Sequence, residues 1–177
     1  MVILISGTTH TGKTALAQKL MEQYKIPHYS IDHLKMGLIR SGQTKLTADN
    51  DDELVPYLWQ IVKEIIKTVI ENKQNLIIEG CYIPFDWQKD FSEEYLKNIK
   101  YYCLVMTENY IENNFSDILK FENIIEHRLV CNDISKSKLI EENGRNLQQC
   151  KKYNLNYILI DNDYNIKIDL GDGSFNG

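Results

Sequence analysis

The sequence has little arginine, few prolines and no long apolar run. Its 177 residues include 3 prolines, and among its 20 basic residues only Arg40, Arg128 and Arg145 are arginines. The longest apolar pattern, residues 54–70, is interrupted by lysine and glutamate, so it does not predict a membrane-spanning helix. Residues 2–5 are apolar but follow no positively charged segment, which argues against a secretory signal. We therefore expect a cytoplasmic protein with no membrane partner.

The cysteines lack the close spacing of a metal site or a redox pair. Cys81, Cys103, Cys131 and Cys150 are widely separated, and no C-x-x-C pair occurs. We interpret them as free thiols, which excludes a disulfide framework and disfavours structural zinc. The net charge of -5 likewise disfavours a nucleic-acid partner, although a small positive pocket is compatible with it.

Short apolar runs alternate with longer helical patterns along the chain. This alternation predicts an α/β fold in which helices sandwich a five-stranded parallel sheet. Asp51 and Asp52 are expected to cap a long helix, with Pro56 in its first turn. We expect one domain over residues 1–170, a flexible tail over 171–177, and a monomer or homodimer. Strands are predicted at 2–6, 28–31, 75–79, 101–106 and 156–160, and helices at 13–24, from 51 to about 70, and within 109–154.

The segment SGTTHTGKT, directly after the first predicted strand, fits the phosphate-binding pattern G-x-x-x-x-G-K-[ST]. Gly7 lets the chain turn off the strand, and Gly12 lets the backbone approach a phosphate. Lys13 is expected to reach the β- and γ-phosphates, and the Thr14 hydroxyl to ligate Mg²⁺. At His10 we expect the backbone amide to contribute more to phosphate binding than the imidazole ring. The predicted nucleotide-binding residues of this loop are Gly7, Thr8, Thr9, His10, Thr11, Gly12, Lys13, Thr14 and Ala15.

Two acids lie at the ends of predicted strands, where ligands bind in open parallel sheets. Asp32 is expected to orient an acceptor hydroxyl or take its proton, and it could also cap the helix starting at His33. Glu79 is a candidate for a Mg²⁺-bound water or an acceptor group, with a solvated strand-end acid as the alternative. No D-x-x-G or N-K-x-D occurs, which argues against a GTPase.

With these motifs in place, the chain resembles the small P-loop kinases: nucleoside monophosphate kinases, shikimate kinase and 2-phosphoglycerate-kinase-like proteins. The resemblance rests mainly on the phosphate-binding loop. It implies ATP with Mg²⁺, a small-molecule acceptor held by an arm at about residues 33–60, and a lid at about 120–145. The closely spaced lid arginines and the glycine-arginine acceptor motif of nucleoside monophosphate kinases are missing, which puts a nucleotide acceptor in doubt.

The resemblance also suggests roles for basic and aromatic residues. Arg40, assisted by Lys35, would hold a carboxylate or phosphate of the acceptor. Arg128 and Arg145 would act from the lid, Arg128 as a catalytic residue, although a single arginine is often a surface ion-pair partner. Tyr82, together with Phe85 and Trp87, either lines an acceptor pocket or packs in the core.

These residues favour an ATP-dependent small-molecule kinase whose catalytic residues are Lys13, Asp32 and Arg128. Two alternatives stay open. One is an ATP-binding regulatory module without metabolite turnover, and the other is a toxin-like or antibiotic-modifying kinase that acts on a larger target.

Overall fold

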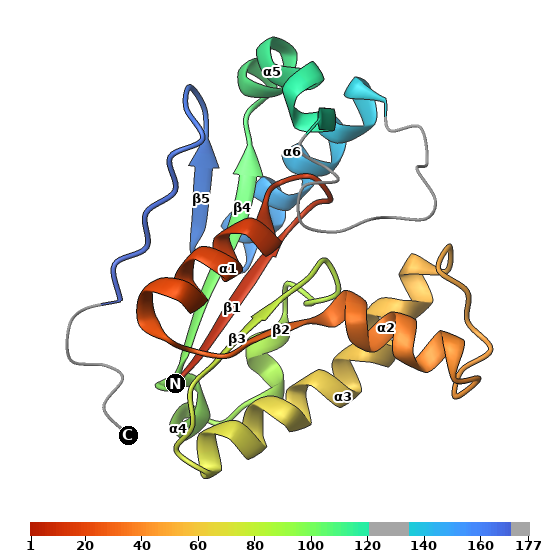
Figure 1. Ribbon diagram of the computed structural model, residues 1–177, viewed down its shortest axis with the longest axis vertical. Helices are drawn as coiled ribbons and strands as arrows, with labels where there is room; N and C mark the ends of the chain where they lie inside the picture. The colour runs from red at the N-terminus through yellow and green to blue at the C-terminus, as the bar shows by residue number, and fades with distance from the viewer. Residues whose placement is uncertain (121–134, 171–177) are drawn as a thin grey trace.

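Five parallel strands form one sheet at the centre of the protein (Figure 1). The computed structural model describes residues 1–120 and 135–170. The strand order is β2-β3-β1-β4-β5, which confirms the predicted α/β fold. Because β1 lies in the middle, the loop that follows it opens at the centre of the sheet's carboxyl edge. The strands are β1 (Val2–Gly7), β2 (His28–Ser30), β3 (Leu76–Glu79), β4 (Ile99–Met106) and β5 (Tyr157–Ile160).

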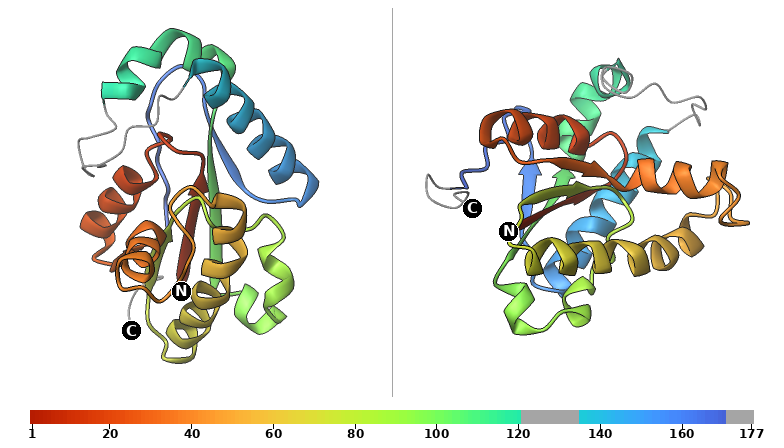
Figure 2. Two further views of the ribbon diagram at one scale, coloured as in Figure 1. Left: turned by 90° about the vertical axis from the view of Figure 1, so that its right-hand side faces the viewer. Right: turned by 60° about the horizontal axis from the view of Figure 1, so that its bottom comes forward.

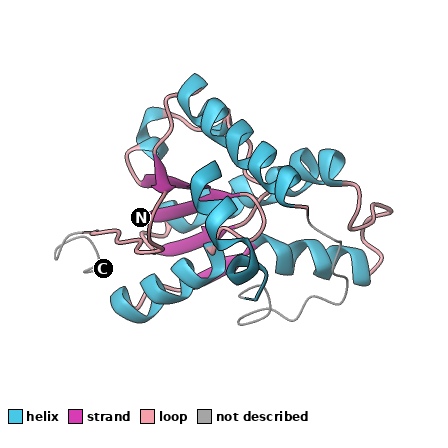
Figure 3. Cartoon of the chain, turned by 90° about the horizontal axis from the view of Figure 1, so that it is seen from above, coloured by secondary structure: helices cyan, strands magenta, loops and turns pink. Residues whose placement is uncertain are grey.

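Helices cover both faces of this sheet (Figures 2 and 3). One face packs against α3, η1 and the end of α6, and the other against α1, α5 and residues 166–170. The helices are α1 (Lys13–Tyr24), α2 (Ile31–Arg40), α3 (Asp51–Glu71), the 3-10 helix η1 (Trp87–Asp90), α4 (Glu93–Leu96), α5 (Glu108–Lys120) and α6 (Lys136–Lys152). Among the described helices, none is both long and apolar enough to cross a membrane.

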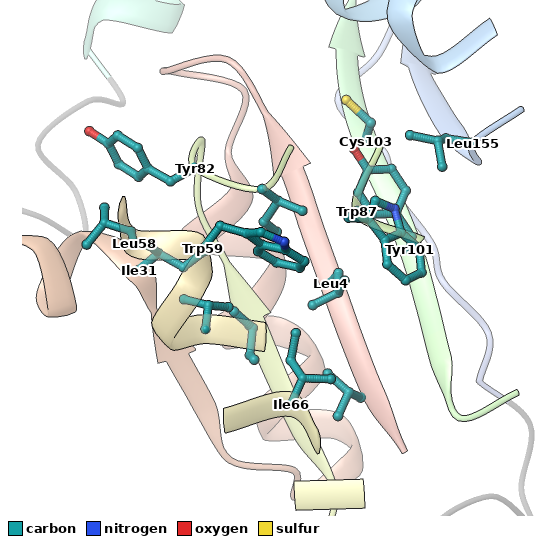
Figure 4. Packing of buried hydrophobic residues seen from close by; sticks show 14 of the residues in the cluster. Leu4, Ile31, Leu58, Trp59, Ile66, Tyr82, Trp87, Tyr101, Cys103 and Leu155 are labelled. Atoms are coloured by element: carbon teal, nitrogen blue, oxygen red, sulfur yellow. The ribbon is translucent and has the colours of Figure 1, made fainter. Parts of the chain in front are cut away.

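The hydrophobic pattern explains this layering. All residues of β1 are buried, as expected for a central strand covered on both faces. In α3 the fully buried Leu54, Leu58, Val62 and Ile66 recur every four residues, so a single stripe faces the sheet. In Figure 4, Ile66 of this stripe lies near Leu4 of β1, and Leu58 lies near Ile31 in the same cluster.

Two local predictions about α3 were wrong. Asn50, not Asp51 or Asp52, occupies the N-cap position, and its side-chain oxygen accepts from the backbone and hydroxyl of Thr47. Pro56 lies in the second turn of α3 rather than the first, on the exposed side of the helix. An exposed proline there loses one hydrogen bond at the solvent face while leaving the apolar stripe intact.

Candidate active site

The phosphate-binding loop connects β1 to α1 and needs glycine at both ends. Gly7 has φ of 145°, and a Cβ there would lie 2.7 Å from the Leu104 carbonyl oxygen and from Thr11 Oγ1. Gly12 has φ of 77° and occupies the N-cap position of α1, which begins at Lys13. Between them, His10 also has a positive φ, 64°. The loop is therefore a tight strand-to-helix turn whose two glycines approach neighbouring atoms too closely for a side chain.

Lys13 is held inside this loop. Its side chain is 6% exposed, and Nζ donates to the Thr8 carbonyl at 2.7 Å. Burial acts to lower the pKa of Lys13, but Cys81, Glu79 and Asp32 nearby more than offset this and raise the pKa above its ordinary value. The lysine is therefore a charged ammonium group at the point where the loop meets the ends of β2 and β3.

Asp32 lies in the first turn of α2, directly after β2. Its Oδ1 is 2.9 Å from Lys35 Nζ, one helical turn away. The helix begins at Ile31 with Ser30 at the N-cap, so the expectation that Asp32 caps a helix starting at His33 was wrong. Asp32 is instead a half-buried carboxylate that interacts electrostatically with Lys13.

Glu79 ends β3 and is 1% exposed, which excludes the alternative of a solvated strand-end acid. It pairs in register with Ile5 on one side and Ser30 on the other. His28 Nε2 lies 3.6 Å from Oε1, and within the described parts of the chain Oε1 accepts no hydrogen bond. Glu79 therefore keeps a buried acceptor oxygen whose hydrogen-bonding capacity is not used within the described residues.

Tyr82, Lys35 and Asp51 form a second polar cluster. Each residue was named from the sequence, but contact among the three was not predicted. Lys35 Nζ donates to the Tyr82 hydroxyl at 2.7 Å, and this hydroxyl donates to Asp51 Oδ1 at 3.1 Å. Burial, with Asp32 and Asp51 nearby, raises the pKa of Tyr82 far above its ordinary range, so the phenol stays protonated. The contacts join α2, the start of α3 and the segment after β3 beside Asp32.

The other aromatic residues after β3 belong to the core. Trp87 is 2% exposed and stacks on Tyr101 with ring centroids 5.7 Å apart. Phe85 packs against the same cluster. In Figure 4, Tyr82 lies at the margin of this cluster with its hydroxyl directed away from Leu4. Of the three aromatics considered, only Tyr82 contributes a polar group to the site side.

The arginines are not gathered around Lys13 in the described parts of the chain. Arg40 is exposed at the end of α2, about 12 Å along the helix from Asp32. Arg145 is exposed on α6 and pairs with Glu141 at 2.9 Å. Arg128 lies outside the described residues. The nucleotide role expected for Arg145 thus finds no support in its placement, which matches the surface ion pair that was the alternative.

Two residues that sequence reasoning missed contact the loop instead. Asn143 of α6, 1% exposed, donates to Thr8 Oγ1 at 3.1 Å. Tyr164, after β5, donates to the Thr11 carbonyl at 3.0 Å. Asn143 and Arg145 are two positions apart on one helix, so their side chains point in nearly opposite directions. No motif marked either contact, because each depends on how distant segments pack.

The comparison with protein families decides where this chain belongs. The family model described as zeta toxin matches residues 1–107, which include the phosphate-binding loop, Asp32, Glu79 and Tyr82. The chain belongs to the zeta toxin family. No curated protein sequence matches it.

Solved structures with a similar fold include proteins described as kinases. A candidate kinase from Chloroflexus aurantiacus j-10-fl has a TM-score of 0.54 at 19% identity, covering 95% of this chain and 91% of that one. A gluconokinase from Sinorhizobium meliloti 1021 has a TM-score of 0.49 at 13% identity, covering 90% and 81%. A shikimate kinase from Bacteroides thetaiotaomicron has a TM-score of 0.49 at 14% identity, covering 91% and 86%. At these identities the similarity concerns the fold alone.

Proposed function

We propose that this zeta toxin family member is an ATP-dependent kinase that transfers the γ-phosphoryl group of ATP-Mg to a hydroxyl of a small-molecule acceptor. The observation that carries the proposal is the placement of Lys13, Asp32 and Glu79 at the ends of three neighbouring strands, where both acids raise the pKa of the buried lysine. A charged lysine inside a glycine-bounded loop suits the phosphates, and two acids beside it suit an acceptor hydroxyl and a cation.

The residues present fit ATP. The loop from Gly7 to Thr14 begins α1 at Lys13, so its backbone amides and the helix N-terminus favour bound phosphate. We assign Lys13 to the β- and γ-phosphates. This role requires Lys13 to exchange its hydrogen bond with the Thr8 carbonyl for phosphate oxygens.

The residues also fit Mg²⁺ that arrives with the nucleotide. Within residues 1–120 and 135–170, no group of three or more His, Cys, Asp or Glu could hold a metal by itself. The Thr14 hydroxyl and the available Oε1 of buried Glu79 are ligands of the kind that nucleotide-bound Mg²⁺ takes, the carboxylate through water. When bound, Mg²⁺ would neutralise charge on the phosphate oxygens.

Asp32 is the residue we assign to the acceptor hydroxyl. Lys35 engages its Oδ1 at 2.9 Å, and we assign Oδ2 to the acceptor hydroxyl. In the transfer, a bond forms between the acceptor oxygen and the γ-phosphorus, and the bond from that phosphorus to the ADP oxygen breaks. The acceptor proton passes to the Asp32 carboxylate as the new bond forms. Tyr82 and Asp51, which are hydrogen-bonded to each other beside Lys35, would contact the other hydroxyl groups of the acceptor.

The test is ADP release from ATP-Mg in the presence of a panel of acceptors: sugars, hydroxy acids, nucleoside monophosphates and UDP-sugars, the last included because of the family. Lys13→Ala serves as the blank. One acceptor is expected to raise ADP release many-fold, and Asp32→Asn to reduce that rise by about 10²-fold or more with ATP affinity unchanged. If ATP stabilises the protein thermally but no acceptor accelerates turnover, the regulatory module replaces this proposal.

A further inference from the structure

Residues 161–170, which we call the strap, run from the end of β5 along α1. Lys19 Nζ donates to the Ile166 carbonyl at 3.2 Å, and Tyr24 hydroxyl to the Ile168 carbonyl at 3.3 Å. Figure 1 shows the strap in blue descending from the loop beyond β5. It is anchored by alternate buried side chains, at Ile166, Ile168 and Leu170, that join the core under α1.

The strap meets the phosphate-binding loop at Tyr164. Its hydroxyl donates to the Thr11 carbonyl at 3.0 Å, and a Cβ added to Gly12 would lie 1.8 Å from that hydroxyl oxygen. Tyr164 therefore occupies the space that glycine leaves on this side of the loop. Gly12 is required by this close approach as well as by its positive φ.

The contact fixes one peptide plane of the loop. In a trans peptide the carbonyl of one residue and the N–H of the next point in opposite directions. With the Thr11 carbonyl held by Tyr164, the Gly12 N–H points away from the strap. The side chain of Thr11 is held as well, because its buried hydroxyl donates to the Thr8 carbonyl at 2.8 Å. The hydrogen bonds of the Thr11 carbonyl and the Thr11 hydroxyl together set the orientation of the Gly12 amide.

We propose that Tyr164 is a positioning residue that orients the Thr11–Gly12 peptide for phosphate, so that nucleotide binding and docking of the strap favour each other. The inference rests on the proposed function, because it concerns nucleotide at this loop. Reciprocity follows from linkage: if the docked strap strengthens nucleotide binding, bound nucleotide holds the strap docked by the same factor.

Tyr164→Phe tests the proposal because it removes the hydroxyl and keeps the ring. Titration calorimetry with ATP-Mg should show affinity about three- to tenfold weaker, the effect of one neutral hydrogen bond. Tyr157→Phe is the matched control, since Tyr157 is an exposed tyrosine of β5 distant from the loop in sequence. It should bind ATP within about twofold of the unaltered protein. Equal affinity of Tyr164→Phe and the unaltered protein would overturn the proposal.

Trypsin cleavage after Lys167, the strap's exposed lysine, reports on docking without turnover. Cleavage requires the strap to leave α1, so ATP-Mg should slow the cleavage of the unaltered protein. In Tyr164→Phe this protection should be weaker by the same factor as the affinity for ATP-Mg. Protection that persists undiminished in Tyr164→Phe contradicts the coupling.

A third measurement needs no nucleotide. The amide resonance of Gly12 in the ligand-free protein should shift in Tyr164→Phe and stay unchanged in Tyr157→Phe. An unmoved Gly12 resonance in Tyr164→Phe shows that the hydroxyl does not orient the peptide. This outcome is distinct from failure of the proposed function, in which the unaltered protein binds no ATP while the Gly12 resonance still responds to the substitution.

Discussion

Asn143 on α6 donates a hydrogen bond to the hydroxyl of Thr8 in the phosphate-binding loop, 3.1 Å away and 135 residues earlier in the chain. The same amide accepts from the backbone N–H of Met106 at 2.8 Å and donates to the Leu139 carbonyl at 2.8 Å. One buried side chain thereby connects α6, the end of β4 and the loop. The phosphate-binding loop is therefore held by α6, which is distant in the chain, as well as by hydrogen bonds within the loop.

Asn143→Ala should destabilise the protein by about 1–3 kcal/mol, because it leaves the buried Met106 N–H without its acceptor. Urea unfolding at neutral pH measures the loss. Asn146→Ala, a half-buried position on the same helix, is the control and should change stability by less than about 0.5 kcal/mol. Equal unfolding midpoints for the two variants would show that Asn143 does not hold these elements together.

Glu79→Gln should raise the Mg²⁺ concentration needed for half-maximal turnover and lower kcat by about 10- to 100-fold. The physical reason is that a neutral amide attracts a Mg²⁺-bound water less than the buried carboxylate does, while filling the same space. Turnover measured across a Mg²⁺ titration gives both numbers. Exposed Glu112→Gln should match the unaltered protein. A Glu79→Gln enzyme with an unchanged Mg²⁺ requirement would remove Glu79 from the cation site.

Tyr82→Phe should raise the KM for the acceptor by about three- to tenfold and leave ATP affinity unchanged. Its hydroxyl links Lys35 to Asp51, so its removal loosens the wall beside Asp32 without touching the phosphate-binding loop. Asp51→Asn should act in the same direction, and the double variant should cost less than the sum of the two. Steady-state kinetics with the acceptor varied measures each effect.

Tyr153→Phe, at the C-cap of α6, controls for loss of a tyrosine hydroxyl elsewhere. Strictly additive effects of Tyr82→Phe and Asp51→Asn would show that the two residues do not act through their hydrogen bond. A rise in KM for ATP instead of the acceptor would move the cluster from the acceptor side to the nucleotide side.

Much of the fold was predictable because its signals are local. A continuous apolar run marks β1, four-residue spacing of apolar side chains marks α3, and the glycine pattern marks the loop at Gly7 and Gly12. Each signal reflects chemistry within about twenty residues of chain. The position of the acids followed as well, because the carboxyl ends of parallel strands share one edge of the sheet.

The contacts missed from the sequence join segments far apart in the chain. Asn143 and Tyr164 reach the loop only because α6 and the strap cross it, and Asp51 meets Tyr82 only through the packing of α3. The placement of Arg145 depends on helix orientation, because a helix directs two residues that are two positions apart to nearly opposite sides. The positive charge of Arg145 suggested a role at the nucleotide, but the orientation of α6 directs Asn143 toward the loop instead.

Asp90 supplies the prediction on pH. The Trp59 indole donates to its Oδ2 at 2.8 Å and Lys63 to its Oδ1 at 3.2 Å, and these bonds hold the pKa of Asp90 below its ordinary value. A carboxyl group with a lowered native pKa contributes stability that is fully present above its unfolded pKa, about 3.9. That contribution is lost as the pH falls through the native pKa.

Asp90→Asn should therefore lower the free energy of unfolding by about 1–2 kcal/mol at pH 7, and the difference should shrink progressively below about pH 4. Urea unfolding of both proteins at pH 7, 5, 4 and 3 measures it. Asp117→Asn is the control, because Asp117 forms an exposed pair with Lys120 that contributes little at any pH. A difference between Asp90→Asn and the unaltered protein that stays constant down to pH 3, or grows there, would mean that the ionised Asp90 carboxylate does not hold η1 against α3.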